Sequence, residues 1–450
     1  MRLRCVSSAL IVCIVGTSAH AQARPARLVR PDSQRAIAFV NVTVVPMDLP
    51  GVLSGQTVLV REGRIVAMGR DRDVLLPQEV FRIDGRGMYL LPGLVDAHVH
   101  LFDESAIPDF AMYLANGVTT IRNMYGTPLH LRLRDEVARG RRVGPTLYTT
   151  SAFAEGNAVR TSWGARRFVQ RARTDGYDAI KLHRPLSPKL FLAVTQEARR
   201  IGLPVVGHAS GRQLSLADAV IAGQRTIEHV ESMMQEGTDD QNPRLADVAP
   251  LVRQLAGKSV CVTPTLVIFQ NVIRITEQYP ALARLTGRSE MRYVDPALRA
   301  QWSPESNEYV TRWRGHEAEI PGALAKFRRQ FTWMQELTKA LAGAGVPLVA
   351  GTDASVAMVI PGFSLLEEMR LLHEAGLSRA QVLAAATRDA AMCIGGGSEF
   401  GTIRVGKRAD LVLLTRNPLE DLSALSAPAG VMARGHWLTS AQLTQQLKPR

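Results

Sequence analysis

Short apolar segments recur between about residue 90 and residue 391, separated by stretches with the polar and apolar spacing of amphipathic helices. Such runs are typical of buried strands, and strands that alternate with helices form parallel sheets. Eight strand–helix units close into a (β/α)8 barrel, which usually takes ~250 residues plus insertions. The sequence therefore predicts an α/β protein with a (β/α)8 TIM barrel, whose strands lie at 94–99, 118–122, 146–150, 179–182, 204–206, 226–228, 260–267 and 347–350.

Both flanks of this region have the alternating pattern of strands. We expect a small β-sandwich domain formed by both chain ends, from residues 22–90 and 400–450, beside a barrel of residues 91–399. Residues 269–331 are an aromatic- and arginine-rich insertion in the barrel. A connection of this length is often functional, so the insertion is either a lid or a helical appendage packed on the barrel rim.

The first residues have the layout of a secretory signal peptide. A basic start, Met1 to Arg4, precedes an apolar run, and small residues flank a cleavage site before Gln22. The alternative is a membrane anchor, but the run is shorter than the ~20 residues that a spanning helix needs. We therefore predict that residues 1–21 are removed, that the mature protein has no membrane span, and that it is exported, either periplasmic or secreted.

Two cysteines remain after this cleavage, Cys261 and Cys393, and their spacing is not that of a metal site. They could pair after export, but two isolated cysteines in a large domain more often pack as buried thiols. The net charge of +13 could attract nucleic acid, yet the arginines are spread along predicted helices and loops. We therefore predict a small-molecule substrate and no nucleic-acid partner. The oligomeric state stays open, with a homo-oligomer among the possibilities.

Two histidines end the first predicted barrel strand. Because side chains alternate along a strand, His98 and His100 project to the same side. At the carboxyl end of a barrel strand, that side is the catalytic mouth. Two converging imidazoles suit a divalent metal such as zinc, whereas the alternative is a pair of surface histidines.

Other polar residues recur at the ends of later strands, and each alone is a weak signal. Lys181 ends the fourth strand, His208 the fifth, His229 the sixth and Asp353 the eighth. Because the carboxyl ends of all barrel strands meet at one face, these side chains are expected around a single mouth. Together with the histidine pair they predict a catalytic metal site.

Lys181 is unusual because only seven of the 54 basic residues are lysine. A desolvated ammonium deprotonates far more easily than a guanidinium does. The free amine can react with carbon dioxide to form a carbamate, an anionic ligand able to bridge two cations. The alternative is a structural ion pair between Lys181 and Asp353 or a neighbouring acid.

The chain from about Val40 to Leu438 resembles the amidohydrolase superfamily, in particular its imidazolonepropionase- and prolidase-like branch with a carboxylated lysine. The resemblance rests on the strand-end residues and on segments 114–122, 262–266, 386–391 and 406–412. It implies two divalent metal ions, with zinc expected. One is held by His98, His100 and Asp353, the second by His208 and His229, and carboxylated Lys181 bridges them.

The predicted function is a metal-dependent hydrolase that cleaves an amide bond, peptide-like or N-acyl-amino-acid, with a metal-bridging hydroxide. Asp353 is the expected catalytic acid and base. His183, Tyr148 and Arg122 are candidate substrate contacts, each with a packing or solvent role as the alternative. A cyclic amide or lactone hydrolase is the alternative activity, and a catalytically inactive metal- or ligand-binding barrel is the alternative from another class.

Overall fold

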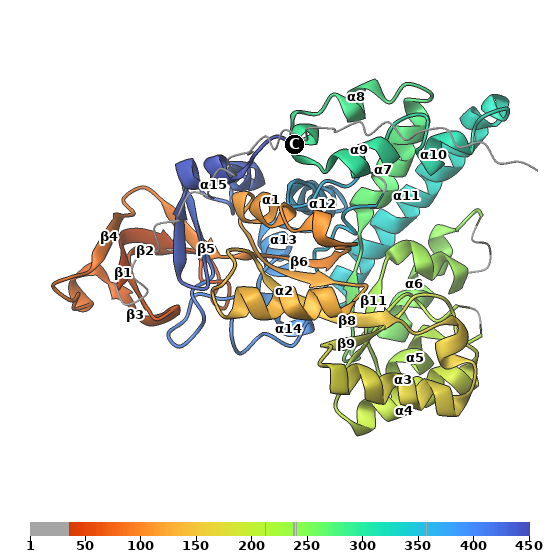
Figure 1. Cartoon of the computed structure of the whole chain (residues 1–450), viewed down its shortest axis with the longest axis horizontal. Helices are drawn as coiled ribbons and strands as arrows, with labels where there is room; N and C mark the ends of the chain where they lie inside the picture. The colour runs from red at the N-terminus through yellow and green to blue at the C-terminus, as the bar shows by residue number, and fades with distance from the viewer. Residues whose placement is uncertain (1–35, 212, 237–238, 240, 357) are drawn as a thin grey trace, which may run out of the picture.

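The computed structural model describes residues 36–450 except 212, 237, 238, 240 and 357. The predicted signal peptide lies outside the described residues. The chain forms a parallel barrel and a separate, mainly antiparallel sheet, which lies at the left of Figure 1. Both chain ends contribute to the small sheet, which confirms the predicted fold class. Among the described residues, no helix has the length and apolar character needed to cross a membrane.

The barrel sheet has seven regular strands, and neighbouring strands pair in parallel in the order β12-β11-β10-β9-β8-β7-β6. Most of their side chains are buried, as expected for strands covered on both faces. The strands are β6 (Leu94–Val99), β7 (Val118–Asn123), β8 (Thr146–Phe153), β9 (Ala179–Leu182), β10 (Val205–Gly207), β11 (Gln224–Glu228) and β12 (Cys261–Thr263).

An irregular segment after Pro347 takes the place of the eighth predicted strand. The backbone N–H of Val349 donates to Val262 in β12 (2.9 Å), and Ala97 in β6 donates to Ala350 (3.0 Å). The segment therefore joins the two end strands. Gly351 is required here, because a Cβ at this position would lie 2.9 Å from the Cβ of His98.

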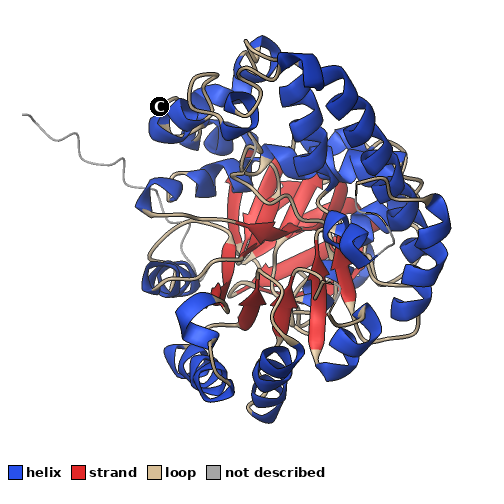
Figure 2. Ribbon diagram, turned by 90° about the vertical axis from the view of Figure 1, so that its right-hand side faces the viewer, coloured by secondary structure: helices blue, strands red, loops and turns tan. Residues whose placement is uncertain are grey.

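Helices surround the barrel strands (Figure 2). Local signals set their ends: the Thr161 hydroxyl caps the start of α3, and Gly176, at φ +91°, ends it. The surrounding helices are α1 (Asp109–Ala115), α2 (Pro128–Ala138), α3 (Ser162–Asp175), α4 (Pro188–Arg200), α5 (Leu216–Ala222), α6 (Val248–Leu255), α11 (Ile320–Gly343), α12 (Phe363–Glu374), α13 (Arg379–Ala385) and α14 (Arg388–Cys393).

The second sheet has the strand order β15-β14-β13-β5-β1-β2-β3, with β4 paired to β1. It folds over one apolar core, so that Phe39 of β1 packs edge-on against Trp437 of β15, with ring centroids 5.2 Å apart. A short helix, α15 (Ser440–Gln446), follows β15 in the chain. The strands are β1 (Ile37–Val44), β2 (Leu53–Arg61), β3 (Arg64–Arg70), β4 (Phe81–Asp84), β5 (Tyr89–Pro92), β13 (Leu411–Leu414), β14 (Gly430–Ala433) and β15 (His436–Thr439).

The insertion is helical and packs on the barrel beside the carboxyl ends of the strands. Its apolar side chains, including Trp302 and Val310, share one core with Met112 of α1 and with Met358 and Ile360. The helix that leaves β12 begins at Leu266, so the predicted seventh strand ends earlier than expected. The helices of this region before α11 are α7 (Leu266–Glu277), α8 (Ala283–Thr286), α9 (Pro296–Gln301) and α10 (Glu308–Thr311).

Cys261 and Cys393 form a disulfide between β12 and α14, with Cα atoms 6.2 Å apart. Of the two alternatives left open by the sequence, pairing and two buried thiols, the structure therefore has the pairing. The positions lie 132 residues apart in sequence, and the pairing arises because α14 lies against the amino-terminal end of β12. Sequence spacing alone carries no information on such a contact.

Candidate metal centre

His98 and His100 lie at the carboxyl end of β6, with Asp353 beside them on the closing segment. The Nε2 atoms of His98 and His100 lie 3.2 Å and 2.9 Å from Asp353 Oδ1. The possible ligand atoms of the three residues all lie within 4.8 Å of one another. This spacing allows one metal ion to contact all three side chains.

Among the described residues, the buried atoms His98 Nε2 and Lys181 Nζ have no hydrogen-bond partner, and Asp353 Oδ1 lies against the two imidazole nitrogens. Leaving a buried polar atom unpaired costs free energy, so most such atoms in proteins have a partner. Imidazole nitrogen and carboxylate oxygen are also the donor types that zinc takes. The residues at the mouth therefore fit a bound metal ion.

The other two predicted histidine ligands lie against this group. The ring centroid of His229 is 4.5 Å from that of His98 and 4.7 Å from that of His208. Burial, and next the nearby His98, lowers the pKa of His229 to about 3, and burial followed by Lys181 lowers that of His208. Both imidazoles are therefore neutral at neutral pH, which is the state that binds a metal.

Lys181 of β9 is 1% exposed. Burial lowers the pKa of its ammonium to about 8, although the carboxylates of Glu228 and Asp353 oppose the shift. Among the described residues its Nζ donates to no partner and joins no ion pair within 4.0 Å, so the alternative of a Lys181–Asp353 salt bridge finds no support. A larger fraction of free amine is therefore present at neutral pH than for an exposed lysine.

A buried carboxylate that the sequence analysis did not single out orients His98. Glu228 Oε2 lies 2.9 Å from His98 Nδ1, and its Oε1 accepts a 2.7 Å hydrogen bond from the Arg122 guanidinium. The Glu228 pKa stays well below its ordinary value despite burial, because Arg122 and His98 favour the carboxylate. A carboxylate at Nδ1 favours the tautomer with its proton there, which leaves Nε2 free to bind a metal.

The local backbone explains why Glu228 and His229 can both serve the site. Neighbours in a strand normally point to opposite faces, which suggested only one inward residue at the end of β11. His229 instead has φ +64° and leaves the strand conformation, and its Nδ1 lies 2.7 Å from the Thr265 hydroxyl. Asp353 also has a positive φ, +62°. A carboxylate directly before a strand-end histidine was the signal in the sequence.

The three candidate substrate contacts lie in different parts of the barrel. His183 lies beside the cluster, 4.9 Å from His208 between ring centroids, and its Nδ1 is 3.1 Å from Glu155. Arg122 lies inside the barrel, where it also donates to the Ala97 carbonyl (2.7 Å). Tyr148 is not brought to the mouth.

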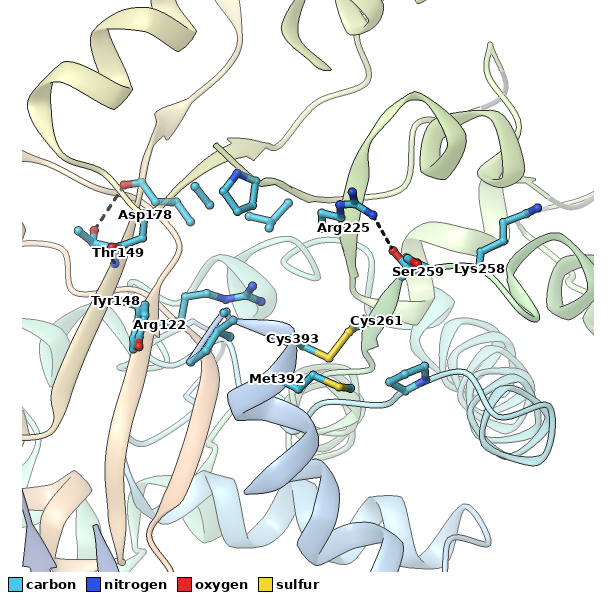
Figure 3. Close-up of a pocket in the computed structure, with 18 residues that line it drawn as sticks. Arg122, Tyr148, Thr149, Asp178, Arg225, Lys258, Ser259, Cys261, Met392 and Cys393 are labelled. Carbon is cyan, nitrogen blue, oxygen red and sulfur yellow. Dashed lines mark hydrogen bonds between the residues drawn. A yellow bond between two sulfur atoms is a disulfide. The ribbon is translucent and has the colours of Figure 1, made fainter. Parts of the chain in front are cut away.

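Tyr148 lies near the start of β8, at the amino-terminal end of the barrel. There it lines a pocket of about 360 Å³ together with Asp178 and the disulfide (Figure 3). Its ring packs against Phe400, with centroids 6.2 Å apart. Because β8 continues to Phe153, three residues past the predicted end of the strand, the sequence placed Tyr148 too close to the mouth.

Known proteins resemble this chain over most of its length. An imidazolonepropionase from Aromatoleum aromaticum is 25% identical over 431 residues, which cover 81% of this chain and 86% of that protein. A protein described as a prolidase from Bifidobacterium longum superposes with a TM-score of 0.68 and 25% identity, covering 92% and 98% of the two chains. A bottromycin amidohydrolase does so with a TM-score of 0.71 and 26% identity, covering 92% and 89%.

These similarities confirm the resemblance to the amidohydrolase superfamily inferred from the motifs. A family model described as the amidohydrolase family matches residues 89–438, which include the whole barrel and most of the carboxyl-terminal strands. The chain therefore belongs to the amidohydrolase family of hydrolytic enzymes.

Proposed function

We propose that the protein is a metal-dependent hydrolase that cleaves the amide bond of a peptide-like or N-acyl-amino-acid substrate. Family membership and the relatives support a hydrolase that acts on carbon–nitrogen bonds. The observation that carries metal dependence is the convergence of His98, His100 and Asp353, whose possible ligand atoms lie within 4.8 Å of one another. The prolidase-like structure favours a peptide-like substrate over the other amides.

Two divalent ions, with zinc expected, are proposed for the mouth. His98, His100 and Asp353 would hold one, His208 and His229 would hold the other, and Lys181, as a carbamate, would supply a further anionic ligand. A bound divalent ion lowers the pKa of water toward ~7 and polarises a carbonyl oxygen, which supplies a nucleophile at neutral pH. The low pKa of Lys181 supports carbamate formation, because only the free amine reacts with carbon dioxide.

Asp353 is proposed as the acid–base residue. Its carboxylate is buried, and the neighbouring His98 and His100 hold its pKa well below the ordinary value, so it enters the reaction ionised. It accepts a proton from the attacking water and then donates that proton to the leaving nitrogen. Glu228 and Arg122 hold His98 in position throughout.

A cyclic amide is the second candidate substrate, because the sequence relatives include imidazolonepropionases.

Export of the protein from the cytoplasm remains part of the proposal. The disulfide between Cys261 and Cys393 supports it, since disulfides persist mainly in oxidising compartments outside the cytosol. Amino-terminal sequencing of the protein recovered outside the cytoplasm should begin at Gln22; a start at Met1 would exclude cleavage.

The test is a screen of the purified mature protein against dipeptide, N-acyl-amino-acid, cyclic amide and lactone libraries, with bound metal quantified. About two equivalents of metal with amide hydrolysis support the proposal. Bound metal without turnover on any library supports the inactive binding barrel instead. A Lys181→Ala variant should lose metal and activity, and full retention of both would contradict its role as a ligand.

A further inference from the structure

A pocket of about 410 Å³ lies where the insertion meets the barrel mouth. Phe102, Ser355 and Val356 line it from the barrel, and residues between Leu298 and Tyr309 line it from the insertion. It adjoins the candidate metal centre, because the Phe102 ring stacks on that of His100, with centroids 5.7 Å apart and planes 10° apart. Ser355 follows Asp353 by two positions in the same segment.

The insertion side of this pocket is fixed to the barrel. Trp302 is 5% exposed and belongs to the apolar core that also contains Met112 of α1 and Ile360. The Asn307 side chain accepts the Tyr309 N–H at the start of α10, with a distance of 2.9 Å. The wall that faces the metal centre is therefore preformed, as ligand pockets usually are.

The lining is aromatic and aliphatic, with uncharged polar groups and a single acid. Phe102, Leu298, Trp302, Tyr309 and Val356 supply the apolar surface, and Glu308 is the one ionisable acid, with no lysine or arginine in the lining. This composition is notable in a chain with 54 basic residues and a net charge of +13.

Tyr309 contributes a phenol hydroxyl to this lining. Burial, followed by the carboxylates of Glu308, Glu231 and Asp353, raises the pKa of its phenol to about 12, with Arg312 opposing. The hydroxyl is therefore protonated at physiological pH and available to donate a hydrogen bond. It lines the same pocket as Phe102, whose ring stacks on that of His100, so it lies on the same side of the barrel as the metal ligands.

We propose that this pocket binds the substrate side chain next to the scissile bond and selects neutral apolar or aromatic side chains against acidic ones, with Tyr309 as its hydrogen-bond donor. The inference rests on the proposed function and specifies its substrate class. Apolar walls stabilise an apolar group by removing it from water, whereas Glu308 repels a second carboxylate. The nearby cation, Arg312, lies over the Tyr309 ring, 4.6 Å from its centroid, and does not line the pocket.

The first test changes the charge of the pocket. We expect the wild-type holoenzyme to hydrolyse N-acetyl-L-phenylalanine with at least about tenfold higher kcat/KM than N-acetyl-L-aspartate. Glu308→Lys should reduce that ratio by about tenfold, because the repulsion becomes an attraction. Glu319→Lys is the matched control, since Glu319 is an exposed insertion acid that does not line the pocket. An unchanged ratio in Glu308→Lys would overturn the proposal.

The second test measures binding without turnover, with free L-phenylalanine and L-aspartate titrated calorimetrically into the metal-loaded protein. Phenylalanine should bind more tightly, and Phe102→Ala should weaken it by about tenfold. Trp163→Ala, an exposed position on α3, should leave it unchanged. If no library amide is hydrolysed but this pattern holds, the proposed function fails and the subsite stands. Equal binding of both amino acids, or no effect of Phe102→Ala, would refute the subsite even in an active enzyme.

Discussion

The two ends of the barrel both carry a pocket, but they use their polar groups differently. At the amino-terminal end (Figure 3), Asp178 accepts hydrogen bonds from the Thr149 backbone (2.7 Å) and from Arg134, and Cys261 is bonded to Cys393. At the mouth, His98 Nε2 and Lys181 Nζ are buried and find no hydrogen-bond partner in the part of the chain that the structure describes.

This difference separates a stabilising end from a functional one. Paired polar groups and a covalent link stabilise the folded chain relative to the unfolded one. Unpaired buried groups destabilise the folded chain, and they are retained where a ligand completes them. Substitutions at the mouth should therefore change metal binding and turnover, whereas substitutions at the other end should change stability alone.

The largest effect is expected at Asp353. Asp353→Asn keeps the size and one oxygen donor but removes the group that accepts and returns the proton. Turnover should fall by about 10²–10⁴-fold, the range that positioned acid–base groups contribute, while metal content stays near that of the wild type. Steady-state kinetics and elemental analysis of the same preparation measure both quantities.

Asn116, buried between α1 and the start of β7, provides a matched polar position at the amino-terminal end of the barrel, where its side-chain amide donates to the Met112 carbonyl (2.9 Å). Asn116→Asp should affect stability more than turnover. Near-normal turnover of Asp353→Asn would remove Asp353 from the acid–base role.

The sequence predicted the mouth well because its signals are local. Each ligand lies at the end of a short apolar strand, and parallel barrel strands bring those ends to one face whatever the loops do. That reasoning is sufficient for His98, His100 and Asp353, which the structure places within ligand distance of one another.

Features that depend on long-range packing could not be predicted. The Cys261–Cys393 pair requires the position of α14 relative to β12, and the irregular eighth strand requires Gly351 to pass close to His98. Glu228 was missed because strand alternation assigns one inward residue, whereas the positive φ of His229 allows two. Tyr148 was predicted near the mouth because the sequence predicted a strand that ends at residue 150, whereas β8 continues to Phe153.

The second prediction concerns the buried link behind His98. Glu228→Gln removes the carboxylate that holds the Nδ1 proton, so His98 should be oriented less well toward the metal. Loss of a group that hydrogen-bonds to a metal-ligating side chain typically weakens metal affinity by about 10–100-fold. Metal titration against a competing chelator measures the dissociation constant.

The same substitution leaves the Arg122 guanidinium buried without its carboxylate, which destabilises the fold. The double variant Arg122→Met/Glu228→Gln removes that unpaired charge and should recover stability but not metal affinity. Recovery of both would show that Glu228 acts only through folding.

The third prediction tests the stabilising end. Cys261→Ala/Cys393→Ala should lower the free energy of unfolding by about 2–5 kcal/mol, because the closed loop between these positions is long. Chemical denaturation of the metal-loaded protein measures this change. Metal content and kcat/KM should match those of the wild type, since the pair lies at the other end of the barrel from the ligands. A parallel loss of metal would mean that the two ends are coupled.

The smallest effect is expected at Tyr148, and it gives the sharpest contrast between the two ends. Tyr148→Phe removes a hydroxyl at the amino-terminal pocket, and kcat/KM should stay within about twofold, as for substitutions remote from a reacting group. Tyr309→Phe removes the same atom beside the mouth and should lower kcat/KM by about tenfold, the worth of a hydrogen bond to substrate. Because both changes delete one oxygen from a partly buried tyrosine, a difference in stability cannot explain a difference in rate. Equal rates in the two variants would show that the distinction between the ends does not extend to substrate binding.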